Sequence, residues 1–343
     1  MAGGEYGVSG FIDGYDAKTG KRVWRFNTIP SKGQPGNETW NGVSWKTGSA
    51  TTWVTGAYDP ETDTVFWGTG NPGPDWNGDV RKGDNLYSDC LIALDPNTGT
   101  KKWHFQYTPH DVNDWDSTQT PSLVNATVSG EPRKMVVLAN RNGFYYALDR
   151  VTGKFIAGQA YVKQTWATGL DESGRPMRVP GIEPTLEGKL IWPSLGGGAN
   201  WYSSSYSPKT DLYYVNVKEE GAIYHKGEAE YHAGALFNGG GQNEYKAEEP
   251  YGAVRALEVA TGKLRWQYKL YRPSHAGLMT TAGGLVFGSN LTSFFALDAA
   301  SGQLLWRFET GSWIDANPIT YMAEGKQYVV IAAGHALLVF GVD

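Results

Sequence analysis

The sequence predicts an all-β protein, a β-propeller of four-stranded antiparallel blades, from a repeated phrase and from its composition. Each copy has an alternating apolar strand, then Asp or Glu with Thr or Ser before Gly, then a strand that carries Trp in four of five copies. The glycine can take the positive φ of such a turn. One unit cannot bury both faces of its sheet, so the copies are expected to stack radially. They occupy residues 14–26, 93–105, 147–155, 256–268 and 296–308.

The composition agrees with this architecture and argues against several kinds of partner. The 343 residues include 45 Gly, 14 Trp, 20 Tyr and 12 Phe, which suit turns and sheet faces. No stretch approaches the roughly 18 apolar residues of a membrane helix. A formal net charge of -5 offers no basic surface, so a nucleic-acid partner is not expected. The single cysteine, Cys90, excludes an intrachain disulfide and is expected to pack inside a strand.

The repeats divide the chain, taken as one propeller domain over residues 1–343, into blades. Whole blades are predicted over residues 53–107, 117–162, 200–270 and 277–310. The third contains a charged, glycine-rich insertion at residues 217–249, which predicts an excursion over the surface. Residues 5–26 offer the last two strands of a blade, and residues 317–343 offer the first two or three. These half-blades could close the ring as a composite fifth blade or, left open, pair with another copy of the chain.

Four longer phrases carry a more specific pattern. They are GGEYGVSGF near the start, WGTGNPGPDWNG at residues 67–78, TPHDVNDWDSTQTP at 108–121 and ANRNGFYYALDR at 139–150. In this order they resemble the pyrroloquinoline quinone (PQQ) dependent alcohol dehydrogenases, the methanol and ethanol dehydrogenase family, over essentially the whole chain. The resemblance implies an axial pocket that holds PQQ and a calcium ion and oxidises a primary or secondary alcohol.

The resemblance also implies a metal site and a catalytic base. Calcium prefers oxygen ligands, and Glu5, Asn71 and Asp114 each lie at the end of a β segment in a different blade. In the family, the matching glutamate and asparagine bind the metal, and the aspartate matching Asp114 lies beside it as general base. A one-residue slip to Asp116 is the alternative, because Asn113 stands where the family commonly has Trp. Without the resemblance, Glu5 would be a solvated carboxylate and Asn71 a turn residue.

Further residues match family positions that contact the quinone. Arg141 matches an arginine or lysine that hydrogen-bonds the reactive oxygens, where a planar cation suits developing negative charge, and is predicted to act with Asp114 in catalysis. Trp53 matches a tryptophan that forms the floor beneath the planar cofactor. His275 stands where the family often has Trp and could line the substrate mouth. The remaining matched contacts are Ala2, Gly3, Gly4, Thr51 and Asn200.

The resemblance predicts PQQ- and calcium-dependent oxidation of an alcohol to an aldehyde or ketone, with hydride transfer to the quinone. It implies a periplasmic location and a cytochrome c as candidate electron acceptor. In the family, further blades, a disulfide and a cofactor-binding arginine precede the position of Glu5, and this sequence shows neither them nor a secretory leader. The alternative is therefore a shortened propeller without dehydrogenase activity, acting as a metal-dependent hydrolase or lactonase, or as a binding scaffold.

Overall fold

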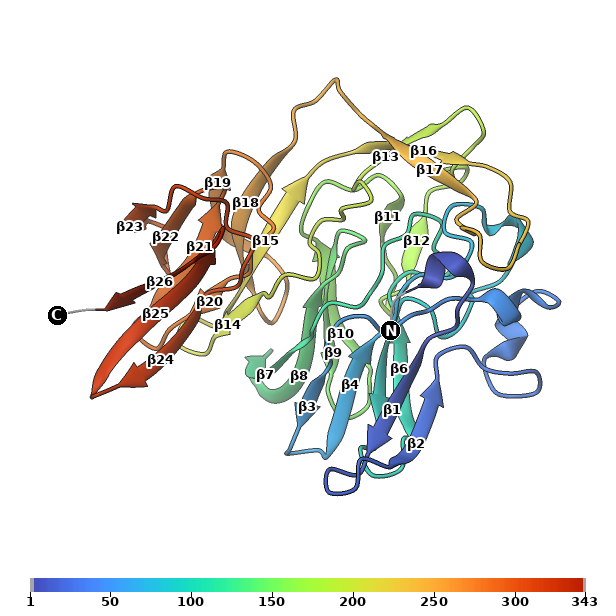
Figure 1. Cartoon of the computed structure of the whole chain (residues 1–343), viewed down its shortest axis with the longest axis horizontal. Coiled ribbons are helices and arrows are strands. Elements are labelled where there is room, and N and C mark those ends of the chain that lie inside the picture. Colours follow the sequence, from blue (N-terminus) through green and yellow to red (C-terminus); the bar gives the residue numbers. More distant parts are fainter. Residues whose placement is uncertain (1–2, 342–343) are drawn as a thin grey trace.

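The computed structural model describes residues 3–341 as antiparallel sheets that follow one another along the molecule (Figure 1). Four sheets have four strands, each ordered as the chain runs. The first two comprise β3 Ala57–Asp59, β4 Thr64–Gly68, β5 Cys90–Leu94 and β6 Lys101–Gln106, then β7 Ser122–Val128, β8 Glu131–Ala139, β9 Phe144–Asp149 and β10 Phe155–Ala160. The others comprise β14 Ser205–Ser207, β15 Leu212–Glu219, β18 Tyr251–Glu258 and β19 Leu264–Leu270, then β20 Met279–Thr280, β21 Leu285–Asn290, β22 Ser293–Asp298 and β23 Leu304–Glu309. The four predicted blades are thereby confirmed.

The terminal half-blades exist, but the described residues do not join them. β1 Phe11–Tyr15 pairs only with β2 Arg22–Asn27, whereas β24 Ile319–Ala323, β25 Lys326–Ala333 and β26 Ala336–Gly341 form a separate three-stranded sheet. Figure 1 shows β24–β26 at the left edge of the molecule and β1 and β2 apart from them, below its centre. The composite fifth blade is therefore wrong for residues 3–341, because the four whole blades do not bring the ends of the arc together.

The repeated phrase folds as expected because its acidic residue organises the turn. Asp16 Oδ1 accepts hydrogen bonds from the backbone N–H and the hydroxyl of Thr19 at 2.7 and 2.8 Å. The Gly20 N–H donates to the Asp16 carbonyl at 2.8 Å, and Gly20 takes a φ of 68°. The same backbone N–H to carboxylate bond recurs at Asp95, Asp149 and Asp298.

Trp and Gly recur together because the Trp of one sheet packs on the turn glycine of the next. A Cβ added to Gly99 would lie 2.5 Å from the Trp24 ring, whose indole N–H donates to the Pro96 carbonyl at 2.8 Å. The same contact joins Trp103 to Gly153 and Trp266 to Gly302. A side chain larger than hydrogen would meet the ring, so the repeat specifies contact between neighbouring blades.

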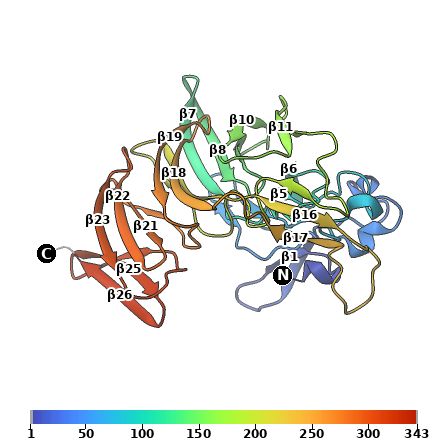
Figure 2. The same cartoon turned by 90° about the horizontal axis from the view of Figure 1, so that it is seen from above.

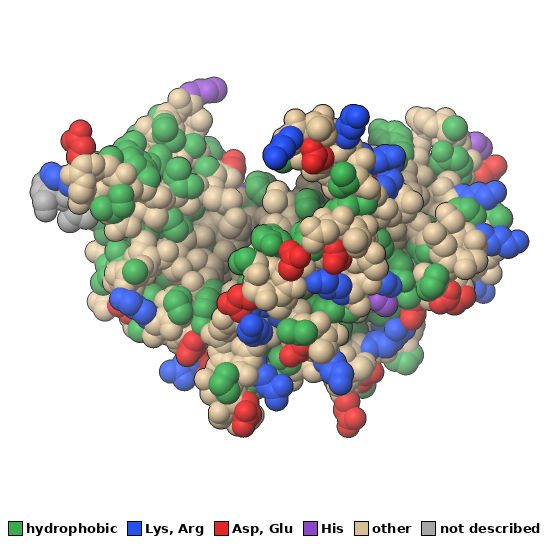
Figure 3. Space-filling view, turned by 90° about the horizontal axis from the view of Figure 1, so that it is seen from below, with side chains coloured by type: hydrophobic (Ala, Val, Ile, Leu, Met, Phe, Trp, Pro, Cys, Tyr) green, Lys and Arg blue, Asp and Glu red, His purple; other side chains and the backbone are tan. Residues whose placement is uncertain are grey.

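The inner strands of the four blades are buried, whereas the outer strand of the last blade is exposed. Cys90 is fully buried at the start of β5, which confirms its expected packing. In contrast, all six residues of β23 are exposed. Figure 3 shows hydrophobic side chains gathered over the lobe that carries the C-terminus, where Leu305, Met322 and Leu337 are exposed. Self-association through these open ends stays a prediction.

Several elements lie outside the blades. They are the hairpin of β11 Ala167–Leu170 and β12 Pro176–Arg178, and a sheet of β13 Lys189–Ile191, β16 Ala222–Lys226 and β17 Gly240–Glu244. Figure 1 shows this second sheet above the blades. Four short 3-10 turns complete the fold: η1 Gly4–Tyr6, η2 Asn37–Thr39, η3 Ser44–Thr47 and η4 Gly78–Val80. Within residues 3–341, no helix has the length and apolar character needed to cross a membrane.

Candidate active site

The loop at residues 111–116 is shaped by its first aspartate. Asp111 accepts hydrogen bonds from the backbone N–H groups of Asn113 and Trp115 at 2.9 and 2.8 Å. Asp114 lies between them with a φ of 59°, which is uncommon for a residue other than glycine. The Arg141 guanidinium donates to the Asp114 carbonyl at 2.8 Å. The strained backbone is thus held from two sides, as is common at functional sites.

Asp116 brings three other predicted residues together. Its carboxylate accepts from the Asn71 backbone N–H at 2.8 Å, from the Trp53 indole N–H at 3.2 Å and from Arg141 Nη1 at 2.8 Å. A Cβ on Gly70 would approach the same carboxylate to 2.3 Å, so only glycine fits there. Trp53 itself is 37% exposed, which leaves a large part of its ring available to a ligand.

Asp114 differs from Asp116, because no described residue hydrogen-bonds its carboxylate. Burial raises the pKa of Asp114 well above its usual range, and the charges of Asp75 and Asp116 add to the effect. Asp114 is partly buried, and a carboxylate in such a place without a protein partner is suited to meet a proton or a cation. The geometry therefore separates the two acids that the sequence left as alternatives.

Asn71 lies next to an acid that we did not single out in the sequence. The Asn71 amide donates to Asp75 Oδ1 at 2.6 Å. Burial raises the pKa of Asp75, the hydrogen bond from Asn71 opposes this shift, and the charges of Glu5 and Asp116 add to it, so that the pKa reaches about 8. Glu5 is exposed on η1, close enough to Asp75 for this effect. Negative charge thus accumulates around Asn71 without an equal number of cationic partners.

This donor set fits a hard cation by its chemistry. Carboxylate and amide oxygens are the ligands calcium prefers, and the uncompensated charge around Asp75 favours a positive ion. Among residues 3–341, however, no three Asp, Glu, His or Cys side chains converge closely enough to hold a metal as they stand.

The predicted glycine and threonine contacts lie beside η1. A Cβ on Gly4 would lie 3.3 Å from the Ser49 Cβ and 3.4 Å from the Thr51 methyl. The Ser49 hydroxyl donates to the Gly4 carbonyl at 2.7 Å. Gly3 precedes the turn with a φ of 104°. Ala2, also predicted as a contact, falls outside the described residues.

Asn200 reaches the same region through the loop after β13. The Leu195 carbonyl accepts from Arg141 Nη2 at 2.7 Å, and the Gly198 N–H donates to the Arg141 carbonyl at 2.9 Å. The Asn200 amide donates to the Gly196 carbonyl at 3.0 Å. Asn200 is therefore tied to the loop that also fixes Arg141.

A stacked pair of rings and a buried lysine lie beyond this loop. The ring of His275, which is exposed, stacks on Tyr202 at 5.7 Å with an interplanar angle of 9°. The Lys218 ammonium lies 5.4 Å from the Tyr202 ring centroid. Burial lowers the pKa of Lys218 to about 8; Glu220 opposes this shift, and the charge of Arg141 adds to it. Lys218 had no motif to mark it in the sequence.

Comparison with known proteins identifies the family. The PQQ family described as glucose/ethanol/alcohol dehydrogenase, beta-propeller domain, matches residues 3–165 and 269–329. Quinoprotein alcohol dehydrogenase PedH of Pseudomonas putida is 40% identical over 97% of this chain. The chain belongs to the PQQ-dependent alcohol dehydrogenase family.

Two solved structures of dehydrogenases share the fold. Quinohemoprotein alcohol dehydrogenase from Comamonas testosteroni superposes with a TM-score of 0.92 at 34% identity, over 98% of this chain and 54% of that one. A europium-containing methanol dehydrogenase gives 0.90 at 36% identity, over 96% of this chain and 62% of that one. The chain spans 60% of the length of PedH.

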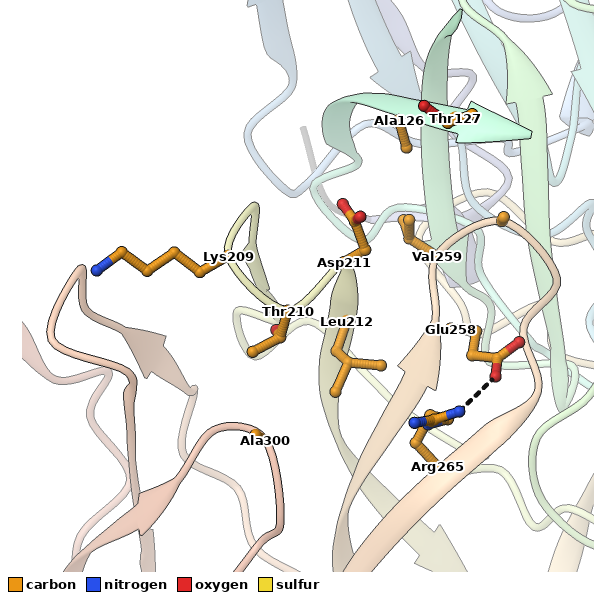
Figure 4. Close-up of a pocket in the computed structure, with 11 residues that line it drawn as sticks. Ala126, Thr127, Lys209, Thr210, Asp211, Leu212, Glu258, Val259, Arg265 and Ala300 are labelled. Atoms are coloured by element: carbon orange, nitrogen blue, oxygen red, sulfur yellow. Dashed lines mark hydrogen bonds and ion pairs between the residues drawn. The ribbon is translucent and has the colours of Figure 1, made fainter. Parts of the chain in front are cut away.

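A separate cavity of about 460 Å³ lies away from this family site (Figure 4). It is bordered by β7, by the turn before β15 and by the loop between β18 and β19, where Arg265 pairs with Glu258 at 3.3 Å. None of the predicted site residues lines it. The candidate active site is therefore identified by its carboxylates and their partners, not by this cavity.

Proposed function

We propose that this chain oxidises a primary or secondary alcohol to an aldehyde or ketone, with PQQ and a cation held among the residues described above. The observation that carries the proposal is the difference between Asp114 and Asp116. Asp116 is bonded to Asn71, Trp53 and Arg141, whereas the Asp114 carboxylate has no partner among the described residues. One acid thus organises the site and leaves the other available for proton transfer.

In this proposal Asp114 is the general base. Its carboxylate accepts the hydroxyl proton while the carbon of the alcohol loses a hydride and becomes a carbonyl carbon. When bound, the quinone supplies the two-electron acceptor, and the cation supplies positive charge that favours ionised carboxylates. Arg141 donates hydrogen bonds toward developing negative charge, and Trp53 offers its exposed ring as a stacking surface. Thr51, Gly3, Gly4 and Asn200 are the proposed further contacts to the quinone.

The cation in this proposal is calcium, held by Glu5, Asn71 and Asp114. Asp75 and Asp116 lie nearby, and their charges raise the pKa values of neighbouring acids. This density of carboxylates also suits a trivalent ion, and one of the similar structures is a europium-containing methanol dehydrogenase. The proposal extends to a periplasmic location and to a cytochrome c as electron acceptor. The quinohemoprotein nature of the relative from Comamonas testosteroni supports such an acceptor.

The test is cofactor binding followed by turnover. The full chain is titrated with PQQ in the presence of calcium or a lanthanide, and the absorbance of the bound quinone and dye reduction by ethanol are measured. We expect saturable binding at micromolar PQQ with one of the ions, and dye reduction that depends on Asp114. Absence of binding with either ion would favour the alternative, a hydrolase, lactonase or binding scaffold that uses the same acidic pocket.

A further inference from the structure

The insertion in the third blade forms a sheet that lies across the candidate site. β16 pairs with β13 on one side, Lys189 opposite Tyr224, and with β17 on the other, Ala222 opposite Glu244. Residues 227–239 form the loop between β16 and β17. Figure 2 shows β16 and β17 near the η1 end of the chain rather than apart from the fold. The segment is therefore more than the surface excursion expected from its composition.

The loop at residues 227–239 contacts the η1 turn that carries Glu5. The Phe237 N–H donates to the Glu5 carbonyl at 2.5 Å. The Phe237 ring is only 5% exposed and meets the Tyr231 ring edge to face at 5.5 Å. Tyr231 in turn covers Gly7, where an added Cβ would lie 2.8 Å from its ring. The turn is held on its other side by the bond from Ser49 to Gly4.

The same loop is also hydrogen-bonded to the segment that follows Asn71. The Trp76 N–H donates to the Asn238 carbonyl at 2.9 Å, and the Asn77 amide donates to the Gly227 carbonyl at 2.7 Å. Lys226 pairs with Asp79 at 2.6 Å. A cavity of about 280 Å³ beneath the loop is lined by the loop and by the segment after Asn71, including Phe237 and Pro74.

The sheet reaches the Arg141 side of the site as well. The Gln242 side-chain oxygen accepts from the Leu195 N–H at 3.0 Å, and the Leu195 carbonyl accepts from Arg141. The Ser194 N–H and hydroxyl donate to the carbonyl and carboxylate of Glu220 at 2.8 and 2.7 Å. One insertion therefore contacts the Glu5 turn, the segment after Asn71 and the loop that fixes Arg141.

We propose that residues 226–242 act as a clamp that sets the position of Glu5 relative to Asn71 and Asp114, with Phe237 as its positioning residue. The inference rests on the proposed function, since Glu5 matters only if a cation binds there. Glu5 is exposed on a three-residue turn flanked by Gly3, Gly4 and Gly7, so the turn itself supplies little rigidity. Groups that orient ligands in this way typically change metal affinity by about 10–100-fold.

The test measures cation binding by the full chain without quinone. Terbium alone is titrated, and its luminescence, sensitised by nearby aromatic residues, gives the dissociation constant. We expect Phe237→Ala to weaken terbium binding about 10–100-fold while the unfolding temperature stays close to that of the wild type. Phe237→Tyr should restore affinity. Leu236→Ala is the matched control, because Leu236 is the adjacent residue and is 61% exposed.

A second variant covers the case in which Phe237→Ala fails to fold. Asn77→Ala removes the side-chain bond to Gly227, together with the bond that Asn77 Oδ1 accepts from the Asp79 N–H, and should weaken terbium binding severalfold. Glu5→Gln identifies the site: wild-type and Glu5→Gln proteins that bind terbium equally would overturn the clamp. So would folded Phe237→Ala or Asn77→Ala proteins with wild-type affinity. A wild-type chain that binds no terbium defeats the proposed function itself, which is a different outcome.

Discussion

The turns of the repeated phrase, at the rim of the blades, and the loop at residues 111–116, at the axis, use aspartate in opposite ways. At the rim, exposed Asp16 accepts hydrogen bonds from the Thr19 hydroxyl and backbone, and these bonds lower its pKa. At the axis, burial and neighbouring acids raise the pKa of Asp114 instead. The rim turn therefore favours the ionised form of its aspartate, whereas the surroundings of Asp114 favour the protonated form. Asp16 thus serves the scaffold, whereas Asp114 is the acid that the proposed function uses for chemistry.

The largest expected effect comes from exchanging the two kinds of aspartate for asparagine. Asp114→Asn should lower dye reduction by ethanol about 10²–10⁴-fold, because asparagine cannot accept the hydroxyl proton. Asp16→Asn changes a rim turn only and should leave turnover unchanged. Steady-state assays of both purified variants check this. Equal activity of Asp114→Asn and the wild type would move the base to another residue.

The glycine turns offer the next effect, which concerns stability. Gly20 and Gly99 share the same turn with φ of 68° and 69°, but a Cβ on Gly20 meets nothing within 4 Å, whereas one on Gly99 meets Trp24 at 2.5 Å. Gly20→Ala should cost about 1 kcal/mol for the left-handed backbone alone. Gly99→Ala should cost about 3 kcal/mol, because the ring must also move. Urea unfolding of the pair measures the difference, and equal losses would show that blade contact adds nothing.

These turns also show why so much of the fold could be predicted from the sequence. The bonds of Asp16 and Gly20 join residues three and four apart, so the pattern is local and repeats visibly. The site contacts are distant: Asp116 meets Asn71 across 45 residues and Trp53 across 63. Asp114 and Asp116 could not be separated without those partners. The contacts that the insertion makes with the site could not be predicted for the same reason, since Asn77 and Gly227 lie 150 residues apart.

A smaller effect, on the pH dependence of stability, is expected from the buried Lys218. Its folded pKa of about 8 lies below the usual 10.5, with Glu220, Arg141 and His275 as its charged or titratable neighbours. Between these two values the unfolded chain keeps its proton and the folded chain has released it, so stability rises with pH across this window. Lys218→Met should lack that rise and be about 2 kcal/mol more stable at neutral pH. Urea unfolding of both proteins at neutral and alkaline pH measures this, and parallel pH profiles would contradict it.

The smallest effect is expected for an exposed ion pair at the rim. Arg265 and Glu258 lie 3.3 Å apart beside the outer cavity, and the Arg265 side chain is 61% exposed. Arg265→Ala should change the free energy of unfolding by less than about 1 kcal/mol, and added salt should reduce even that. Thermal unfolding at two ionic strengths checks the size. A loss as large as that of Gly99→Ala would mean that rim charges matter more than blade contact.

The clamp joins the start of the polypeptide to a stretch that is synthesised much later. Asn77 meets Gly227, and Glu5 meets Phe237, only after more than half of the 343 residues have been translated. Until then the bond from Ser49 to Gly4 helps to hold the Glu5 turn, while the early sheets can already form from neighbouring residues. In the proposed function, ion binding at the Glu5 turn therefore follows the synthesis of Phe237, and a chain cut before this residue would keep its early sheets but lack the clamp.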